Sequence, residues 1–407
     1  MINHFPCGHW HKKNNGSRPI VIKKLAIAPQ YYNAESDPEN GIAVASYDLS
    51  THTWTYEGAV LNGYPMSGPS TLRIASDYIA HYGPWSDVDM FHEFMKLHIF
   101  ENQTATSTSV WTYATGVNTF FDQYVTTRSM LMDCNSAGLV ACIAYIEKAA
   151  GVTKNAWAIR CSTDKGVTFN APYYFPATEY TTYIKGCVRI DGIGNIWVSF
   201  IDHPAVIGSS GYFYIYKSSN SGASWTEIKK YDLGTAHPLD LSYTVDSTGQ
   251  YQYVALRQYS GATVKNLYRS SDYGVNWDVV IFPYGGGNDL IMHTSNKEYV
   301  ALGWYTTPAV DNRIKVSSDY GSSFSDVVPP TTIASTYTDM QSDGQYIAYV
   351  DGGTYFLPDV LSIGCIYSED NGLTWSKAEI ISGGDFNQKA FTQGYTPSVD
   401  IISTIVT

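Results

Sequence analysis

Short apolar runs alternate with polar turns along most of the chain, and many of these turns combine Asp or Asn with Gly. The clearest case is the segment 190–197, in which Asp191 and Gly194 separate two apolar runs. Asp and Gly favour tight turns, whereas apolar and β-branched residues on either side favour strands. The pattern therefore predicts antiparallel hairpins. Comparable hairpins are predicted at 74–80 with Asp77, 132–140 with Asp133, 245–251 with Asp246, 295–300 with Asn296 and 342–347 with Asp343.

A second element recurs between these hairpins, and we call its copies the box turns. Each has Ser, then Asp or Asn two residues later, Gly two residues after that, and an aromatic residue at the end. The Asp or Asn side chain can accept hydrogen bonds from nearby backbone N–H groups, and Gly supplies a positive φ, so the expected role is structural. The box turns lie at 162–169, 218–225, 270–277, 317–324 and 368–375. Their key residues Asp164, Asn220, Asp272, Asp319 and Asp370 are successively 56, 52, 47 and 51 positions apart.

Repeats at this spacing indicate a solenoid, an array or a propeller. The box turns resemble the Asp box, or BNR repeat, of the sialidase-like β-propeller superfamily, in which the box forms the turn between the third and fourth strands of a blade. The resemblance covers nearly all of residues 20–407. It implies an all-β chain with a single β-propeller of four-stranded antiparallel blades at 20–407, preceded by an N-terminal extension at 1–19.

Two degenerate copies of the box turn are predicted, at 112–120, where Ala114 replaces the Asp, and at 46–54, where Asp48 lies in a turn one residue longer. Residues 41–57 then form a second hairpin that lacks a first, and 397–403 resemble an inner strand that lacks its blade. Joining them gives one blade built from both ends of the chain, which removes the open edges of a ring. The prediction is seven blades, with six as the alternative.

The composition favours a polar but weakly charged surface that is rich in aromatic rings. Charged residues make up 15% of the chain, and it contains 34 Tyr and 10 Trp. A net charge of −12 argues against nucleic acid or an anionic membrane as the main partner, because either needs a basic surface. No run of 18 apolar residues occurs, so no membrane insertion is expected.

The six cysteines show neither the spacing of a metal site nor that of a dense disulfide framework, so we expect free thiols. No metal and no cofactor is predicted. The first residues lack the charged and apolar regions of a secretory signal, although box repeats of the resembled superfamily usually occur in exported proteins. An extracellular or virion location is therefore expected.

Candidate binding residues follow from the topology that the resemblance implies. The box turns and the first-hairpin turns share one face, here called the box face, and the other connections emerge on the opposite loop face. Loops on a rigid scaffold commonly carry binding groups, and the longest is expected at 82–109. Aromatic rings and carboxylates suit sugars, although such loops could also simply pack on each other. The candidates are Trp85, Asp87, Asp89, Tyr173, Tyr174, Glu179, Tyr180, Asp202, His203, Asp351 and Tyr355.

No catalytic residue can be assigned. For a sialidase the resemblance implies three arginines, a Tyr nucleophile with a Glu partner, and an Asp acid/base. The first of those arginines would lie in a Phe/Tyr-Arg-Ile-Pro motif, but this chain has Ser17-Arg18-Pro19-Ile20. Arg73, Arg189 and Arg257 could still converge on the axis. A glycosidase with paired carboxylates, or a lyase with a His or Tyr base, remains open.

The function expected from these observations is non-catalytic: a recognition or structural propeller that binds a glycan, or a host-surface or virion protein, through its loop face. A bacteriophage tail, fibre or decoration protein would combine box repeats with a chain that lacks a signal sequence. The alternative is a glycoside hydrolase or polysaccharide lyase of sialidase-like fold that acts on an extracellular polysaccharide. A rigid spacer without a ligand is the third hypothesis.

Overall fold

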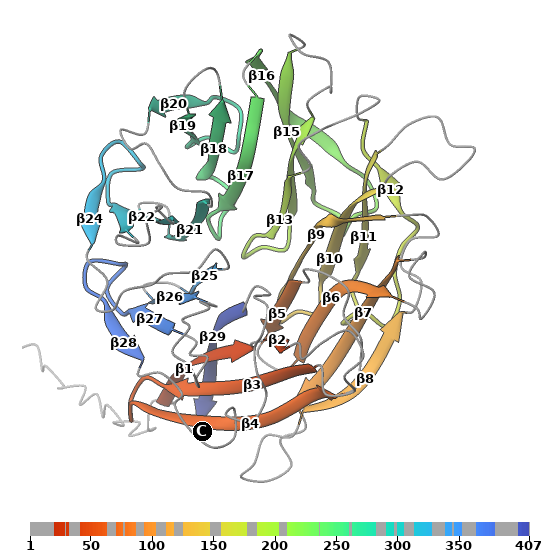
Figure 1. The fold of residues 1–407 in the computed structure, drawn as a ribbon, viewed down its shortest axis with the longest axis vertical. Helices are drawn as coiled ribbons and strands as arrows, with labels where there is room; N and C mark the ends of the chain where they lie inside the picture. The colour runs from red at the N-terminus through yellow and green to blue at the C-terminus, as the bar shows by residue number, and fades with distance from the viewer. Residues whose placement is uncertain are drawn as a thin grey trace, which may run out of the picture.

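The computed structural model consists of antiparallel β-sheets arranged around a central space (Figure 1). Among the described residues no helix is long and apolar enough to span a membrane. The described residues are 20–28, 30–31, 41–62, 71–75, 78–86, 93–102, 111–117, 125–146, 156–176, 185–202, 210–235, 237–259, 263–281, 290–296, 299–304, 313–327, 338–343, 346–351, 364–378 and 398–406.

The first three four-stranded sheets follow the chain, and in each of them sequential strands are hydrogen-bonded neighbours. One contains β5 (Thr71–Ala75), β6 (Tyr78–Ser86), β7 (Glu93–Asn102) and β8 (Trp111–Val117). The next contains β9 (Val125–Cys134), β10 (Val140–Ile146), β11 (Ala156–Ser162) and β12 (Tyr173–Tyr174). The third contains β13 (Gly186–Ile190), β14 (Ile196–Asp202), β15 (Gly211–Ser218) and β16 (Thr226–Gly234).

Three further sheets have the same order. The first of these contains β17 (His237–Val245), β18 (Gln252–Tyr259), β19 (Thr263–Ser270) and β20 (Asp278–Ile281). The second contains β21 (Leu290–Asn296), β22 (Tyr299–Trp304), β23 (Arg313–Ser317) and β24 (Ser325–Val327). The last contains β25 (Thr338–Asp343), β26 (Tyr346–Asp351), β27 (Gly364–Ser368) and β28 (Ser376–Ala378).

The remaining sheet of the described residues contains strands from both ends of the chain. β29 (Ser398–Val406) pairs with β1 (Ile20–Ala28) in the register Ile20↔Val406 to Ala28↔Ser398. β1 also pairs with β3 (Gly41–Asp48), which pairs with β4 (Thr53–Asn62) and with the short β2 (Gln30–Tyr31). Strand β1 therefore supplies the partner that the isolated hairpin at 41–57 lacked in the sequence.

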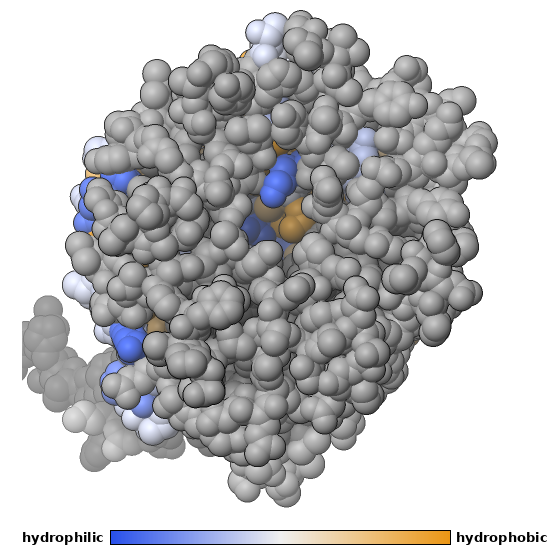
Figure 2. Space-filling view, in the orientation of Figure 1, coloured by the Kyte–Doolittle hydropathy of each residue, from blue (hydrophilic) through white to orange (hydrophobic). Residues whose placement is uncertain are grey.

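The innermost strands of successive sheets contact one another in a cycle. β5 contacts β9, β9 contacts β13, and the contacts continue through β17, β21 and β25 to β29, which contacts β5. The space-filling view has a hollow near its centre, in which hydrophilic and hydrophobic residues are both visible (Figure 2). Apolar side chains such as Trp157, Phe175 and Phe200 fill the layer between the β9–β12 and β13–β16 sheets.

Three first-hairpin turns lie wholly within the described residues and share one geometry, which corrects one residue assignment. Gly138, Gly194 and Gly249 have φ of 89°, 86° and 78°, and each donates its N–H to the carbonyl three residues earlier. Asn135 occupies that position in the β9–β10 hairpin, so the prediction that Asp133 is the turn residue was wrong. The side chain of Asn135 accepts hydrogen bonds from the backbone N–H groups of Ala137 and Leu139, which is the role expected of the Asp.

All five box turns also share one geometry. In the turn between β19 and β20, Ser270 Oγ donates to Asp272 Oδ1 at 2.8 Å, and the N–H of Gly274 donates to Ser270 Oγ at 3.0 Å. Asp272 Oδ1 also accepts the N–H of Asn276 at 2.9 Å. The corresponding Gly to Ser bonds in the other four turns are 2.7–2.9 Å long. Each turn connects the third and fourth strands of its sheet.

The degenerate copies differ in outcome. Asp48 accepts the N–H groups of Ser50 and Thr51 in the turn between β3 and β4, at the position predicted for the longer variant. The copy predicted at 112–120 was wrong, because Trp111–Val117 form strand β8 and the connection from β7 lies earlier, outside the described residues. Without Asp at position 114, the alternating Thr, Tyr and Val residues pair as a strand. The loop expected at 82–109 was also wrong, since β6 and β7 occupy much of it.

Candidate functional site

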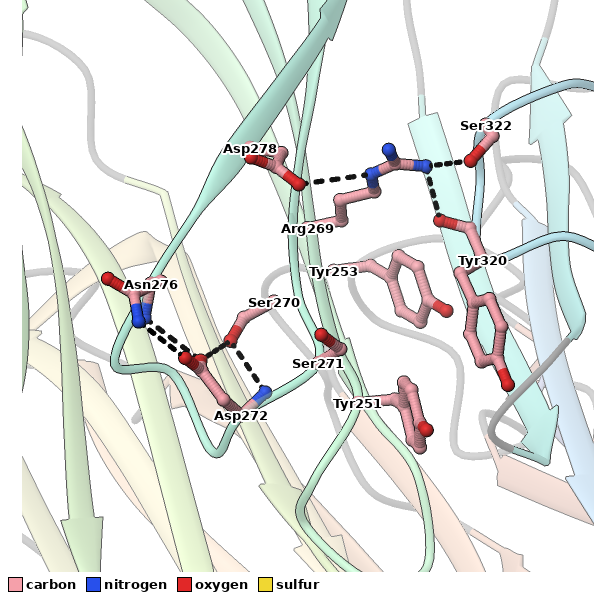
Figure 3. A pocket seen from close by; sticks show the side chains of 10 residues that line it. All are labelled: Tyr251, Tyr253, Arg269, Ser270, Ser271, Asp272, Asn276, Asp278, Tyr320 and Ser322. Atoms are coloured by element: carbon pink, nitrogen blue, oxygen red, sulfur yellow. Dashed lines mark hydrogen bonds and ion pairs between the residues drawn. The ribbon is translucent and has the colours of Figure 1, made fainter.

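A pocket of about 350 Å³ lies between the β17–β20 sheet and the box turn of the following sheet (Figure 3). It lies on the box face, because box-turn residues line it. The box turn and the first-hairpin turn of this sheet lie together on that face, since Tyr273 N donates to Gln250 O at 3.0 Å. The lining residues are Tyr251, Tyr253, Arg269, Ser270, Ser271, Asp272, Asn276, Asp278, Tyr320 and Ser322.

Strand register brings three of these side chains to one surface. Tyr253 of β18 pairs with Arg269 of β19, and Arg269 pairs with Asp278 of β20. Directly paired residues of antiparallel strands point to the same side of a sheet. The three side chains therefore form a row that faces the β21–β24 sheet. The box turn of that sheet supplies Tyr320 and Ser322 from the other side of the boundary.

Arg269 holds the two sheets together at the pocket. Its Nη1 atom donates to the backbone carbonyl of Tyr320 at 3.0 Å and to the hydroxyl of Ser322. Its Nε atom lies 4.0 Å from Asp278 Oδ2. Figure 3 shows the guanidinium extended along this boundary, so the group fixes the pocket wall as well as lining it.

Tyrosine rings form the apolar wall of the pocket. The rings of Tyr251 and Tyr320 are stacked with centroids 4.9 Å apart and planes inclined by 18°. Tyr253 also lines the pocket and is buried. Burial raises the pKa of Tyr253, so its hydroxyl stays protonated at neutral pH.

The opposite wall is the box turn itself. Asp272 Oδ2 accepts the side-chain amide of Asn276 at 2.7 Å, in addition to the two bonds that Oδ1 accepts. Burial alone would raise the pKa of Asp272, but the hydrogen bonds from Asn276 and Ser270 outweigh it and lower that pKa. Asp272 is therefore charged at neutral pH and serves as a fixed acceptor. Asp278 is the more available carboxylate, since 81% of its side chain is exposed.

A second cluster lies on three consecutive innermost strands. Asp133 of β9 lies 3.8 Å from Arg73 Nε of β5, and its Oδ2 accepts the N–H of Ile190 in β13 at 2.7 Å. Burial raises the pKa of Asp133, while Arg189 and Arg73 act in the opposite direction. Arg73 and Arg189 thus act electrostatically on the same carboxylate, and whether they converge on an axis stays a prediction. The side chain of the third predicted arginine, Arg257, lies outside the described residues.

Among the described residues one Tyr–Glu hydrogen bond occurs, and its tyrosine is a packed side chain. Tyr216 donates to Glu227 Oε2 at 2.8 Å, between the third and fourth strands of its sheet rather than on an innermost strand. Burial and then Glu227 raise the pKa of Tyr216. A nucleophilic phenol needs the opposite shift, so this pair does not resemble a catalytic Tyr–Glu pair.

The predicted binding residues do not form one site within the described part of the chain. Tyr173 packs on Phe175 and Trp225, whereas Tyr174 of β12 is 47% exposed. Asp202 is buried at the end of β14, and Trp85 and Asp351 belong to strands β6 and β26. Asp87, Asp89, Glu179, Tyr180, His203 and Tyr355 lie outside the described residues. No group of three His, Cys, Asp or Glu residues in the described ranges could hold a metal ion.

Comparisons with known proteins give a fold but no family. No family model matches the chain, and no curated protein matches it. The polysaccharide lyase Uly1 is similar over 84% of this chain and 87% of its own, with 8% identity and a TM-score of 0.55. A Hadza microbial sialidase, Hz136, covers 81% of this chain and 87% of its own with 9% identity and a TM-score of 0.45. An α-L-arabinanase of Penicillium chrysogenum covers 68% and 85% with 10% identity and a TM-score of 0.47.

The antiparallel four-stranded sheets and the likeness to Uly1 define the class of fold. The protein is all-β, is built from antiparallel four-stranded sheets, and has a fold of the β-propeller type. At this level of identity the likeness extends to the fold alone, and fold does not specify function. The function therefore has to be argued from the site.

Proposed function

We propose that the protein is a recognition propeller that binds glycans, and that the pocket between Tyr251 and the Tyr320 box turn is a binding site. The pocket itself carries this proposal: tyrosine rings and fixed carboxylate, amide and guanidinium groups together line about 350 Å³. Ligand sites are concave, with aromatic walls and a few placed polar groups. A tyrosine face suits the C–H face of a sugar ring, and the polar groups suit its hydroxyls.

The scaffold of the proposal is a closed seven-bladed propeller. The cycle of contacts between innermost strands and the pairing of β1 with β29 support it. A ring without open sheet edges holds its turns rigidly. A site built across two adjacent blades, as this pocket is, then keeps its shape without a ligand.

The loop-face residues of the sequence analysis are retained as a second part of the proposal. Tyr174 supports it most directly, since almost half of its ring is exposed on the outermost strand. A glycan or a host-surface or virion protein is the proposed partner for that face. An extracellular or virion location would bring either partner within reach.

A printed array of neutral and acidic glycans tests the proposal. Tyr251→Ala should lower binding of the best glycan at least about tenfold, because a stacked aromatic wall is lost. Tyr273→Ala is the matched control, since Tyr273 lies in the box turn on the same face without lining the pocket. Binding that survives Tyr251→Ala but disappears in Tyr174→Ala would move the site to the loop face. Release of sugar fragments during incubation would indicate an enzyme instead.

A further inference from the structure

We propose that the box-face pocket selects uncharged sugar rings and disfavours acidic ones. The inference rests on the proposed function and names the ligand class of the same site. It follows from the charges that line the pocket and from the bonds that those charges already make.

The charge balance of the pocket is negative. Arg269 is the one cation among the lining residues, whereas Asp272 and Asp278 are both carboxylates. Arg269 already donates to Tyr320 O and Ser322 Oγ and lies beside Asp278. A ligand carboxylate would therefore approach two negative groups and one cation, and part of that cation's hydrogen-bonding capacity is already taken.

Two exposed oxygen atoms at the rim are free acceptors within the described part of the chain. Asp278 Oδ1 and Asn276 Oδ1 have no hydrogen-bond partner among the described residues, and both side chains are exposed. Sugar hydroxyls can donate to such oxygens, whereas a carboxylate cannot. Figure 3 shows Asn276 and Asp278 on the side of the pocket opposite the tyrosines, so a ring resting on Tyr251 or Tyr320 would direct hydroxyls towards them.

The preference should depend on the charge of Asp278. This carboxylate is exposed and makes one ion contact, at 4.0 Å. Asp278→Asn therefore removes the charge but keeps a side chain of the same shape. Asp272 is unsuitable for this purpose because its oxygens hold the box turn together.

The test uses ligand pairs that differ only in oxidation at C6, namely methyl β-D-glucoside with methyl β-D-glucuronide, and methyl β-D-galactoside with methyl β-D-galacturonide. Affinities are measured by ligand-observed NMR titration at low salt. We expect the uncharged member to bind about tenfold more tightly. Asp278→Asn should narrow that ratio, and higher salt should narrow it as well. Glu369→Gln, which removes one exposed charge from another box turn, should leave the ratio unchanged.

The outcomes separate this inference from the proposed function. A uronide that binds as tightly as its neutral partner, with binding lost in Tyr251→Ala, would overturn the charge preference and leave the glycan site in place. An unchanged ratio in Asp278→Asn would also overturn it. Absence of binding by all four glycosides and on the array would overturn both proposals.

Discussion

Gly222 lies so close to Cys161 that a Cβ atom at position 222 would be 2.5 Å from the Cys161 Sγ atom. Gly222 belongs to the box turn of the β13–β16 sheet, and Cys161 belongs to β11 of the sheet before it. Asn170 strengthens this boundary, since it accepts the N–H of Cys161 at 2.7 Å and donates to Gly222 O at 3.2 Å. Box turns therefore connect neighbouring sheets as well as neighbouring strands.

Gly222→Ala should destabilise the protein by about 3 kcal/mol. Two effects add, because φ is 86° and the new Cβ would overlap a buried thiol. Gly194→Ala is the control: its φ is also 86°, but no atom lies within 4 Å of the added Cβ. That variant should lose only about 1 kcal/mol from backbone strain. Urea unfolding measures both, and equal losses would show that the contact with Cys161 contributes nothing.

The repeat predicted much of this architecture because its geometry is local. The hydrogen bonds among Ser270, Asp272 and Gly274 form within five residues, so the turn can be predicted from the sequence alone. The register of the hairpins was less certain. Asp133 and Asn135 both fit a turn by residue type, and the hydrogen bond from Gly138 N to Asn135 O distinguishes them. At Ala114 the spacing suggested a turn, whereas cross-strand pairing produced β8.

Stability should fall below about pH 4, because box-turn carboxylates are held in their charged form. Hydrogen bonds from Thr168, through its hydroxyl and its N–H, lower the pKa of Asp164 to about 2 from its ordinary 3.8. The pKa values of Asp272, Asp319 and Asp370 are also lowered. A lowered pKa gives stability that is present above the ordinary value and lost as the pH falls through the folded value. Thermal unfolding between pH 7 and pH 2 measures the loss.

Asp164→Asn should reduce this acid sensitivity with little change at pH 7. Asn220 already performs the same task in the next box turn, where Oδ1 accepts Ser224 N at 2.9 Å and Nδ2 donates to Ser224 Oγ at 2.8 Å. Thr168 can accept the equivalent bond by reversing its hydroxyl. The reverse change, Asn220→Asp, should add acid sensitivity. The explanation fails if neither variant alters the dependence of unfolding on pH.

The pocket could not have been predicted from the sequence in the same way. Its walls come from neighbouring sheets, and the stacking of Tyr251 on Tyr320 depends on how those sheets pack. The one local signal was Tyr in the positive-φ position of the box turn, at Tyr273 and Tyr320. Of these two, Tyr320 lines the pocket described above, where it stacks on a tyrosine of the preceding sheet.

Asp133→Ala should destabilise the protein by about 3 kcal/mol, because Arg73 and Arg189 lose the carboxylate between them and Ile190 N loses its acceptor. Asp133→Asn should cost less, since the amide oxygen can still accept from Ile190. The pKa of Asp133 is raised, whereas the pKa values of the box-turn aspartates are lowered, so its effect on the pH dependence of stability is opposite. The raised pKa contributes stability at pH values below the ordinary pKa of Asp. That contribution is lost as the pH rises through the pKa of Asp133 in the folded protein. The free energy of unfolding, measured by denaturation at pH 7, should fall more in Asp133→Ala than in Asp133→Asn. Equal losses in the two variants would contradict this account.

Thiol labelling should distinguish the cysteines by burial. Cys134, Cys142, Cys161, Cys187 and Cys365 are all free, as predicted, and Cys7 lies outside the described residues. Burial raises the pKa of Cys161 and that of Cys365 to about 12, so neither forms the reactive thiolate readily. In a Cys7→Ser background an aromatic disulfide reagent should modify Cys134 first. Fast modification of Cys161 in the folded protein would show that the boundary at Gly222 opens.

Pairing of the two ends of the chain should permit a disulfide between β1 and β29. The adjacent register pairs are Ile22↔Thr404 and Lys23↔Ser403. Antiparallel pairs alternate between Cα separations of about 5.5 and 4.5 Å, and both lie within the range of disulfides. Each double-cysteine variant should therefore oxidise, and the better one should raise the unfolding temperature, since the cross-link closes a very long loop. Ile22→Cys combined with Ser403→Cys is the control: these positions face opposite sides of the sheet and should stay reduced. Failure of both matched pairs to oxidise would contradict the pairing on which the proposed ring closure depends.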